Sequence, residues 1–161
     1  MMAQHHQVSR VLMACLAAAT CAMAAEGGVS LSADSPWVMA LANESTGFAM
    51  AARDVQLDAY RALGAPPVVL TAVPSASATS AGTSVLVAGS PGGNSAVAAM
   101  VAAGLVPENC TTTWEAHCVV PVPASRSPFG LDTVVATGAG KRGPIYALYE
   151  LAHRGLGADP Y

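Results

Sequence analysis

Short apolar runs alternate along this chain with segments of helical periodicity, and glycine or proline separates most of them. The runs are rich in valine and alanine, which suits strands, and they cover 36–42, 68–73, 84–88, 115–122 and 131–137. Apolar side chains recur at every third or fourth position over 46–63, 96–103 and 144–152, as in an amphipathic helix. This alternation predicts an α/β (α+β) fold, a small mixed sheet with about three helices.

Capping and breaking residues bound the predicted elements. Thr46 can cap the first helix and Gly64 can end it. Pro121 cannot donate a ladder hydrogen bond, so the strand that contains it should lie at an edge of the sheet or end there. Residues 74–83 are Ser, Ala, Thr and Gly without periodicity, and we expect a flexible linker inside the domain.

The first 25 residues have the features of a secretory signal peptide. A basic opening that ends at Arg10 precedes the weakly apolar run 11–22, and Ala22-x-Ala24 supplies a small-x-small cleavage pattern. With about twelve residues the run is too short to cross a bilayer. An organelle transit peptide is the alternative, although it would be richer in Arg and Ser. We therefore expect residues 1–25 to be removed and 26–161 to be secreted as one domain without a membrane span.

Charged residues are sparse, at 11% against 53% hydrophobic residues, which is the reverse of a disordered chain. Lys and Arg number 7 and Asp and Glu 10, for a formal net charge of −3. Without a basic excess to displace counterions from phosphates, a nucleic acid is not an expected partner. A length of 161 residues fits one domain.

Removal of the leader changes the cysteine count. Cys15 and Cys21 leave with it, so Cys110 and Cys118 remain as a pair in an oxidising compartment. A disulfide that closes this short loop is the expected outcome. Zinc would need more ligands than these two thiols and His117 supply, so no metal site is predicted.

Two N-glycosylation sequons begin at Asn43 and Asn109 and fit an exported eukaryotic protein. In a bacterial protein they would carry no meaning. The second sequon has Cys110 as its middle residue, so glycosylation there would compete with the disulfide.

Two glycine-rich turns raise the question of a cofactor. Gly138-x-Gly140-x-x-Gly143 follows a predicted strand and opens a helix, as a dinucleotide fingerprint does, with Asp159 about twenty residues further on. That acid should end a second strand, whereas Asp159 lies among Gly and Pro residues, so a truncated dinucleotide-binding domain is the less favoured alternative. Residues 89–95 resemble a phosphate cradle but lack the lysine of a P-loop, which favours an ordinary turn. No cofactor is expected.

The sequence contains no complete set of catalytic side chains. Outside the leader, histidine is limited to His117 and His153, and there is no Gly-x-Ser-x-Gly elbow. Asp54 and Asp58 share one helix face, which suits an exposed surface better than a glycosidic cleft. We therefore predict no catalytic residue in this chain.

The most specific motif is Lys-Arg-Gly-x-Ile-Tyr at 141–146. Lys141 and Arg142 could bind a sugar carboxylate or a phosphate, or they could remain solvated or dock on a neighbouring domain. The motif, with the residues up to 152, resembles the segment that leads into the catalytic barrel of glycoside hydrolase family 115, the xylan α-1,2-glucuronidases. Further similarity to that family covers 51–64, 85–89 and 114–115, so the resemblance extends over most of 37–161.

The resemblance implies a non-catalytic α/β domain of the kind that precedes glycosidase TIM barrels, including those of hexosaminidases and family 67 glucuronidases. In such enzymes the acid and base lie on the barrel, so this chain, truncated before the barrel, should be inactive alone. Its last helix would pack on the barrel through Ile145, Leu148 and Tyr149. Lys141 and Arg142 would reach a uronate of a glucuronoxylan-type polysaccharide. A stand-alone secreted carbohydrate-binding module is the alternative.

Overall fold

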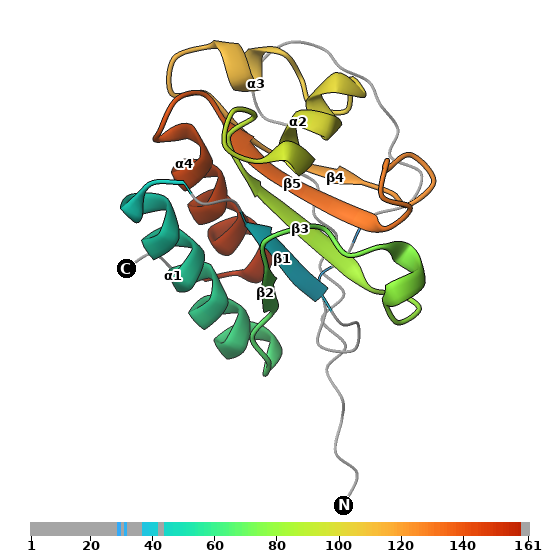
Figure 1. Cartoon of the computed structure of the whole chain (residues 1–161). Helices are drawn as coiled ribbons and strands as arrows, with labels where there is room; N and C mark the ends of the chain where they lie inside the picture. The colour runs from blue at the N-terminus through green and yellow to red at the C-terminus, as the bar shows by residue number, and fades with distance from the viewer. Residues whose placement is uncertain (1–28, 30, 32–36, 42–43, 159–161) are drawn as a thin grey trace, which may run out of the picture.

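The computed structural model of the chain describes residues 29, 31, 37–41 and 44–158 (Figure 1). The predicted signal peptide at 1–25, the sequon residue Asn43 and Asp159 lie outside the described residues.

Five strands of the described residues form one mixed sheet. In the order β2-β1-β3-β5-β4, the first four strands run parallel and β4 pairs antiparallel with β5 at the edge. The strands are β1 (Trp37–Leu41), β2 (Val68–Leu70), β3 (Ser84–Gly89), β4 (His117–Val122) and β5 (Asp132–Gly138). The predicted fold class, a small mixed α/β sheet, is confirmed, and Pro121 lies on an edge strand as expected.

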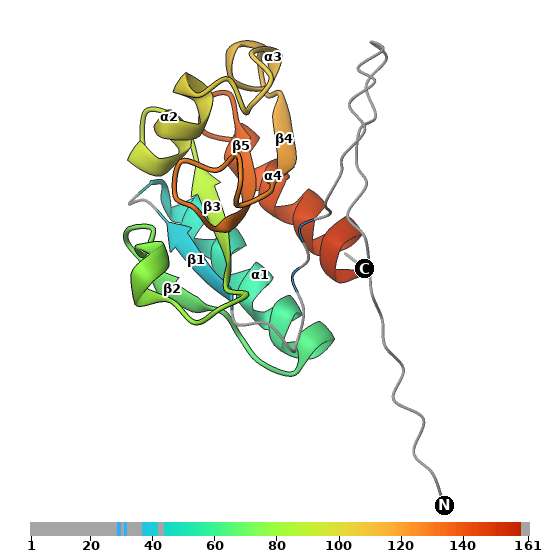
Figure 2. The ribbon, with the colours of Figure 1, turned by 90° about the vertical axis from the view of Figure 1, so that its right-hand side faces the viewer.

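Helices cover both faces of this sheet (Figures 1 and 2). On one face α1 (Thr46–Leu63) lies beside α4 (Gly143–Glu150), which continues as a π-helix, η2 (Leu151–Leu156). On the other face lie α2 (Ser95–Ala102) and the four-residue α3 (Asn109–Thr112), and the short 3₁₀-helix η1 (Ala76–Ala78) joins β2 to β3. The helices that follow the neighbouring strands β1 and β3 thus lie on opposite faces of the sheet. This arrangement is typical of doubly wound α/β proteins.

The first helix shows how local sequence sets these elements. Ser45, rather than Thr46, is its N-cap, and the Ser45 hydroxyl accepts from the Phe48 N–H at 3.3 Å. Gly64 ends the helix with φ of 82°, a backbone conformation that glycine adopts at little cost. The side chains of α1 that face the sheet are apolar, namely Phe48, Ala51, Ala52, Val55 and Ala59.

Alternation along β3 divides the core between the two faces of the sheet. Leu86 packs with α1 and α4, whereas Val85 and Val87 pack with Val97 of α2. All six residues of β3 are buried, as expected of a central parallel strand. The fold therefore has two apolar layers, each closed by its own helices.

Leu148 lies in the first of these layers and is fully buried, and Ile145 is partly buried against the same cluster. The expectation that Leu148 packs on an external barrel is therefore wrong, and Ile145 is already used in part inside the domain. The helical stripe is used inside the domain, because α4 packs on the sheet and on the neighbouring helix α1. Tyr149, by contrast, is 45% exposed.

Three local details differ from the sequence-based expectation. β2 ends at Leu70 rather than at 73. Leu70 pairs with Ala40 of β1, and β1 itself ends at the next residue, Leu41, so β2 has no partner strand further along. The segment 74–83 contains a 3₁₀ turn, held by the Ala78 N–H to the Ser75 carbonyl at 2.9 Å. The helix α3 was not anticipated, because four residues show no periodicity.

Candidate functional site at the carboxyl end of the sheet

Four loops meet at one end of the sheet. Strands β1, β3 and β5 are parallel, so the loops that follow them emerge together. Strand β4 runs the other way, and its first residue, His117, pairs with Gly138 at the end of β5. The turn at 113–116 therefore lies at the same end of the sheet as the loops 44–45, 89–94 and 139–142. Doubly wound proteins bind ligands at this end, where the helices after β1 and β3 leave toward opposite faces.

Two side chains of the chain itself fill the space between β1 and β3. The Glu44 carboxylate accepts from the Ser90 N–H, and a Cβ added to Gly93 would lie 2.6 Å from Glu44 Oε1. The buried Asn94 amide donates to the Ala40 carbonyl at 3.2 Å and the Ala88 carbonyl at 2.8 Å. The loop 89–95 is thus an ordinary turn filled by Glu44, and not an open phosphate cradle.

The turn between β5 and α4 packs directly on the turn before β4. The Ala116 carbonyl accepts from the Ala139 N–H at 2.8 Å. A Cβ added to Gly138 would lie 2.5 Å from the Ala116 oxygen, and one added to Gly143 would lie 2.6 Å from it. Gly138 and Gly143 are therefore required for close packing of backbone on backbone. This packing accounts for two of the three glycines of the fingerprint without a dinucleotide.

An ion pair joins the same two turns through side chains. The Arg142 guanidinium lies 3.1 Å from the Glu115 carboxylate, and both groups are solvent-accessible. Glu115 has φ of 52°, the one described residue other than glycine with a positive φ. Lys141 is exposed and forms no ion pair with any residue in the described ranges. Trp114 is 84% exposed.

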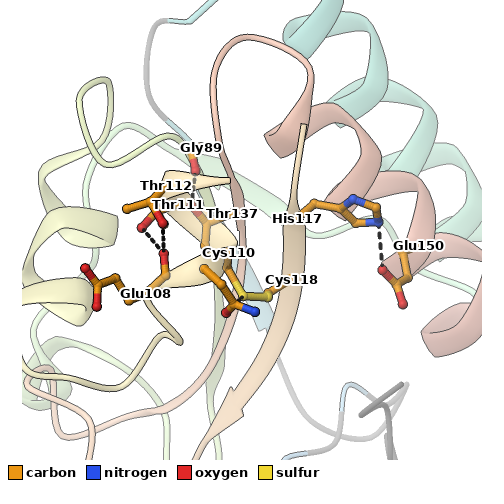
Figure 3. The surroundings of a disulfide bond; sticks show 10 residues. Gly89, Glu108, Cys110, Thr111, Thr112, His117, Cys118, Thr137 and Glu150 are labelled. Atoms are coloured by element: carbon orange, nitrogen blue, oxygen red, sulfur yellow. Dashed lines mark hydrogen bonds and ion pairs between the residues drawn. A yellow bond between two sulfur atoms is a disulfide. The ribbon is translucent and has the colours of Figure 1, made fainter. Parts of the chain in front are cut away.

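The disulfide between Cys110 and Cys118 closes the loop that carries Trp114 (Figure 3). It connects α3 to β4 across 5.7 Å between the Cα atoms, and Cys110 is buried against the α2 side of the core. On the neighbouring strand, the Thr137 hydroxyl donates to the Gly89 carbonyl at 2.8 Å. The base of the turn is therefore fixed to both β4 and the core.

Side-chain contacts of His117 and Glu150 connect the start of β4 to the last helix. His117 Nε2 lies 3.0 Å from a Glu150 carboxylate oxygen. Figure 3 shows the His117 ring directed toward Glu150. The other oxygen of Glu150 lies 3.2 Å from Arg154, and the His117 ring lies 5.8 Å from that of Tyr146. These contacts hold α4 against the edge strand.

A shallow groove between α1 and η2 is separate from the carboxyl-end loops. Its lining is mixed: apolar Leu57, Ala152 and Ala158 lie among polar side chains, namely Asp54, Asp58, Arg61, Tyr149 and His153. The Tyr149 hydroxyl donates to Asp54 at 3.0 Å, and Arg61 lies 3.2 Å from Asp58. Burial, and next the bond to the Asp54 carboxylate, raises the pKa of Tyr149. The two acids of α1 thus have surface partners, and they do not face each other across a cleft.

The predicted ligand-binding pair is only partly free. Lys141 and Arg142 lie together in the β5–α4 turn, but Arg142 is paired with Glu115. Asn109 lies exposed on α3, with its side-chain oxygen 3.7 Å from Cys110 Sγ. The roles of Glu44 and Ala116 were missed, because each acts through contacts with residues distant in sequence. The sequence around Glu44 does not indicate that its carboxylate binds the loop that begins at Gly89.

Neither models of known protein families nor the sequences of curated proteins give a significant match to this chain. In the part of the chain that the structure describes, no three His, Cys, Asp or Glu side chains are grouped so that they could hold a metal ion. No helix among residues 44–158 has the length and apolar content needed to cross a bilayer.

Proposed function

We propose that this chain is the exported, non-catalytic α/β domain of an α-glucuronidase-like glycoside hydrolase that acts on a glucuronoxylan-type polysaccharide. One observation supports the proposal most directly. The segment that contains the most specific motif of the resemblance, 138–146, and the less specific Trp114-Glu115 step are distant in sequence yet form one packed unit. Ala116 accepts from Ala139, Gly138 and Gly143 pack on the Ala116 oxygen, and Glu115 pairs with Arg142.

The surroundings of the acidic side chains favour a non-catalytic role. Asp54 accepts from Tyr149, Asp58 pairs with Arg61, and Glu150 pairs with His117 and Arg154. A glycosidase needs two carboxyl groups that face each other across the scissile bond. None of these three acids faces another carboxyl group across a cleft. This is consistent with catalytic residues that lie on a separate barrel.

The surface that meets such a barrel must differ from the buried stripe of α4. Leu148 is enclosed by its own domain, so the exposed side of the last helix is available instead. Tyr149 of α4 and Leu57 of α1, each 45% exposed, line the groove between α1 and η2. An amphipathic mixture of this kind is typical of an interface between domains of one chain.

Sequencing the transcript and the gene beyond the codon for Tyr161 tests the proposal. We expect an open frame of several hundred codons that encodes a glycosidase barrel. A stop codon at that point, or a frame that encodes an unrelated protein, would overturn the proposal.

A kinetic experiment on that full-length protein tests the role of Arg142. Arg142→Ala should raise KM for glucuronoxylan and leave secretion unchanged, because the exposed Arg142–Glu115 pair contributes little to stability. Unaltered kinetics together with poorer secretion would instead show that Arg142 has a structural role.

A further inference from the structure

Trp114 is the most exposed of the large apolar side chains in the described ranges, at 84%. The next are Met50 at 63% and Val68 at 61%. An indole can bury more apolar area than almost any other side chain, so its placement in solvent forgoes a large favourable contribution to folding. Single exposed apolar residues are common, however, so the exposure gains meaning only from the surroundings of Trp114.

The backbone on both sides of Trp114 is fixed. The disulfide closes the loop from Cys110 to Cys118, and the Ala116 N–H donates to the Thr113 carbonyl at 3.0 Å. Glu115 is held at φ of 52°, a left-handed conformation that costs a non-glycine residue about 1–2 kcal/mol. Backbone strain of this kind is concentrated at functional sites. Trp114 is thus presented on a rigid turn.

Two cations lie beside this turn. Arg142 reaches the residue next to Trp114, because its guanidinium pairs with Glu115, yet the Arg142 side chain remains 68% exposed. A guanidinium has five N–H donors, so the single bond to Glu115 leaves most of them for a ligand. Lys141 precedes Arg142 and is exposed. An exposed aromatic side chain and two exposed cations therefore belong to two turns that pack on each other at the carboxyl end of the sheet.

We propose that Trp114, Lys141 and Arg142 form a binding site for an acidic saccharide. The apolar face of a pyranose ring stacks on the indole, and the uronate carboxylate accepts hydrogen bonds from Arg142 and Lys141. The inference deepens the proposed function, on which it rests for the choice of a uronate. It adds an aromatic platform to the site and does not require a catalytic barrel for binding.

Calorimetric titration of the purified chain tests the inference. The probes are a xylo-oligosaccharide with a glucuronic acid branch, the unbranched oligosaccharide of the same length, and a short poly-glutamate. We expect binding of the first alone. Trp114→Ala should weaken that binding about tenfold or more, in the range of a truncated aromatic anchor. Arg142→Lys should weaken it less than Arg142→Ala, because Arg142→Lys keeps the charge but loses the fork of donors.

Tyr60→Ala is the matched control. Tyr60 is 57% exposed, but it lies near the end of α1, which runs from the carboxyl end of the sheet toward the opposite end. Its replacement should leave the affinity unchanged. Equal affinity for the neutral oligosaccharide or for poly-glutamate, or unchanged affinity in Trp114→Ala, would overturn the inference.

The two proposals can fail separately. If a downstream barrel is encoded but the chain does not bind the acidic oligosaccharide, the saccharide site is wrong and the domain assignment stands. If the chain binds the oligosaccharide and no barrel follows, the domain assignment is wrong. The protein would then act as a stand-alone binding module for acidic saccharides.

Discussion

Gly138 and Gly143 meet the carbonyl group of Ala116 with no space for a side chain at either glycine. The obstructing atoms are backbone atoms, which cannot turn away as a flexible side chain would. At the scale of single residues, the glycines are therefore required by packing, whatever ligand the turn binds.

Gly138→Ala should lower the free energy of unfolding by about 3 kcal/mol, the upper part of the usual range for overpacking. The control is Gly92→Ala, because a Cβ at Gly92 has nothing within 4 Å. Urea denaturation of the three proteins measures the difference. Similar midpoints for the two variants would mean that the two turns are not in contact.

This contact marks what the sequence could predict at the residue scale. The glycine spacing was visible, and it indicated a tight strand-to-helix turn. The partner was not, because Ala116 is an ordinary alanine whose backbone oxygen makes the contact. Glu44 is a similar case, since its target is the N–H group of Ser90, 46 residues away.

At the scale of elements, α1 and α4 are joined through a polar contact at their outer edge as well as through the core. Burial and the Asp54 carboxylate both favour the neutral Tyr149 phenol, so the pKa of Tyr149 in the folded protein lies above its value in the unfolded chain. The stability gained from this difference is fully present below about pH 10 and is lost as the pH rises through the folded pKa.

Tyr149→Phe should therefore be less stable than the parent at pH 8, and this difference should shrink at pH 11. The loss should be below about 1 kcal/mol, because the bond is exposed to solvent. Tyr60→Phe is the control, because Tyr60 lies on α1 and its hydroxyl makes no side-chain hydrogen bond within residues 44–158; it should show no such change. Urea midpoints at the two pH values measure the effect. A difference that is constant with pH would contradict the coupling.

The elements themselves could be predicted where local signals were strong. The helix predicted over 46–63 and the strands predicted at 84–88 and 131–137 have long apolar patterns and clear ends. The structure places these elements at 46–63, 84–89 and 132–138, so their ends differ by at most one residue. The prediction failed for β2, because the length of this strand is set by the strand that pairs with it. It also failed for α3, because a helix of four residues is too short to show periodicity. These failures share one cause, which is dependence on tertiary contacts.

At the scale of the whole molecule, each face of the sheet is closed by helices of this chain. The layer under α1 and α4 includes Met39, Phe48, Leu86 and Leu148, all buried almost completely. The apolar face of α4 could be predicted from the sequence, but the elements that pack on it could not. Periodicity indicates which side of a helix is buried, and it does not indicate which other element covers that side.

Leu148→Ala decides between a target inside the domain and one outside it. In this structure the substitution leaves a cavity between α4, α1 and the sheet, and it should cost about 3 kcal/mol of unfolding free energy in the isolated chain. Leu57→Ala makes the same chemical change at a position 45% exposed on α1, where it should cost far less. If both variants unfolded at the same urea concentration as the parent, Leu148 would not be a core residue, and its stripe would be free to bind an external barrel. A loss confined to Leu148→Ala would show that α4 completes this domain, so that any partner must use its exposed side.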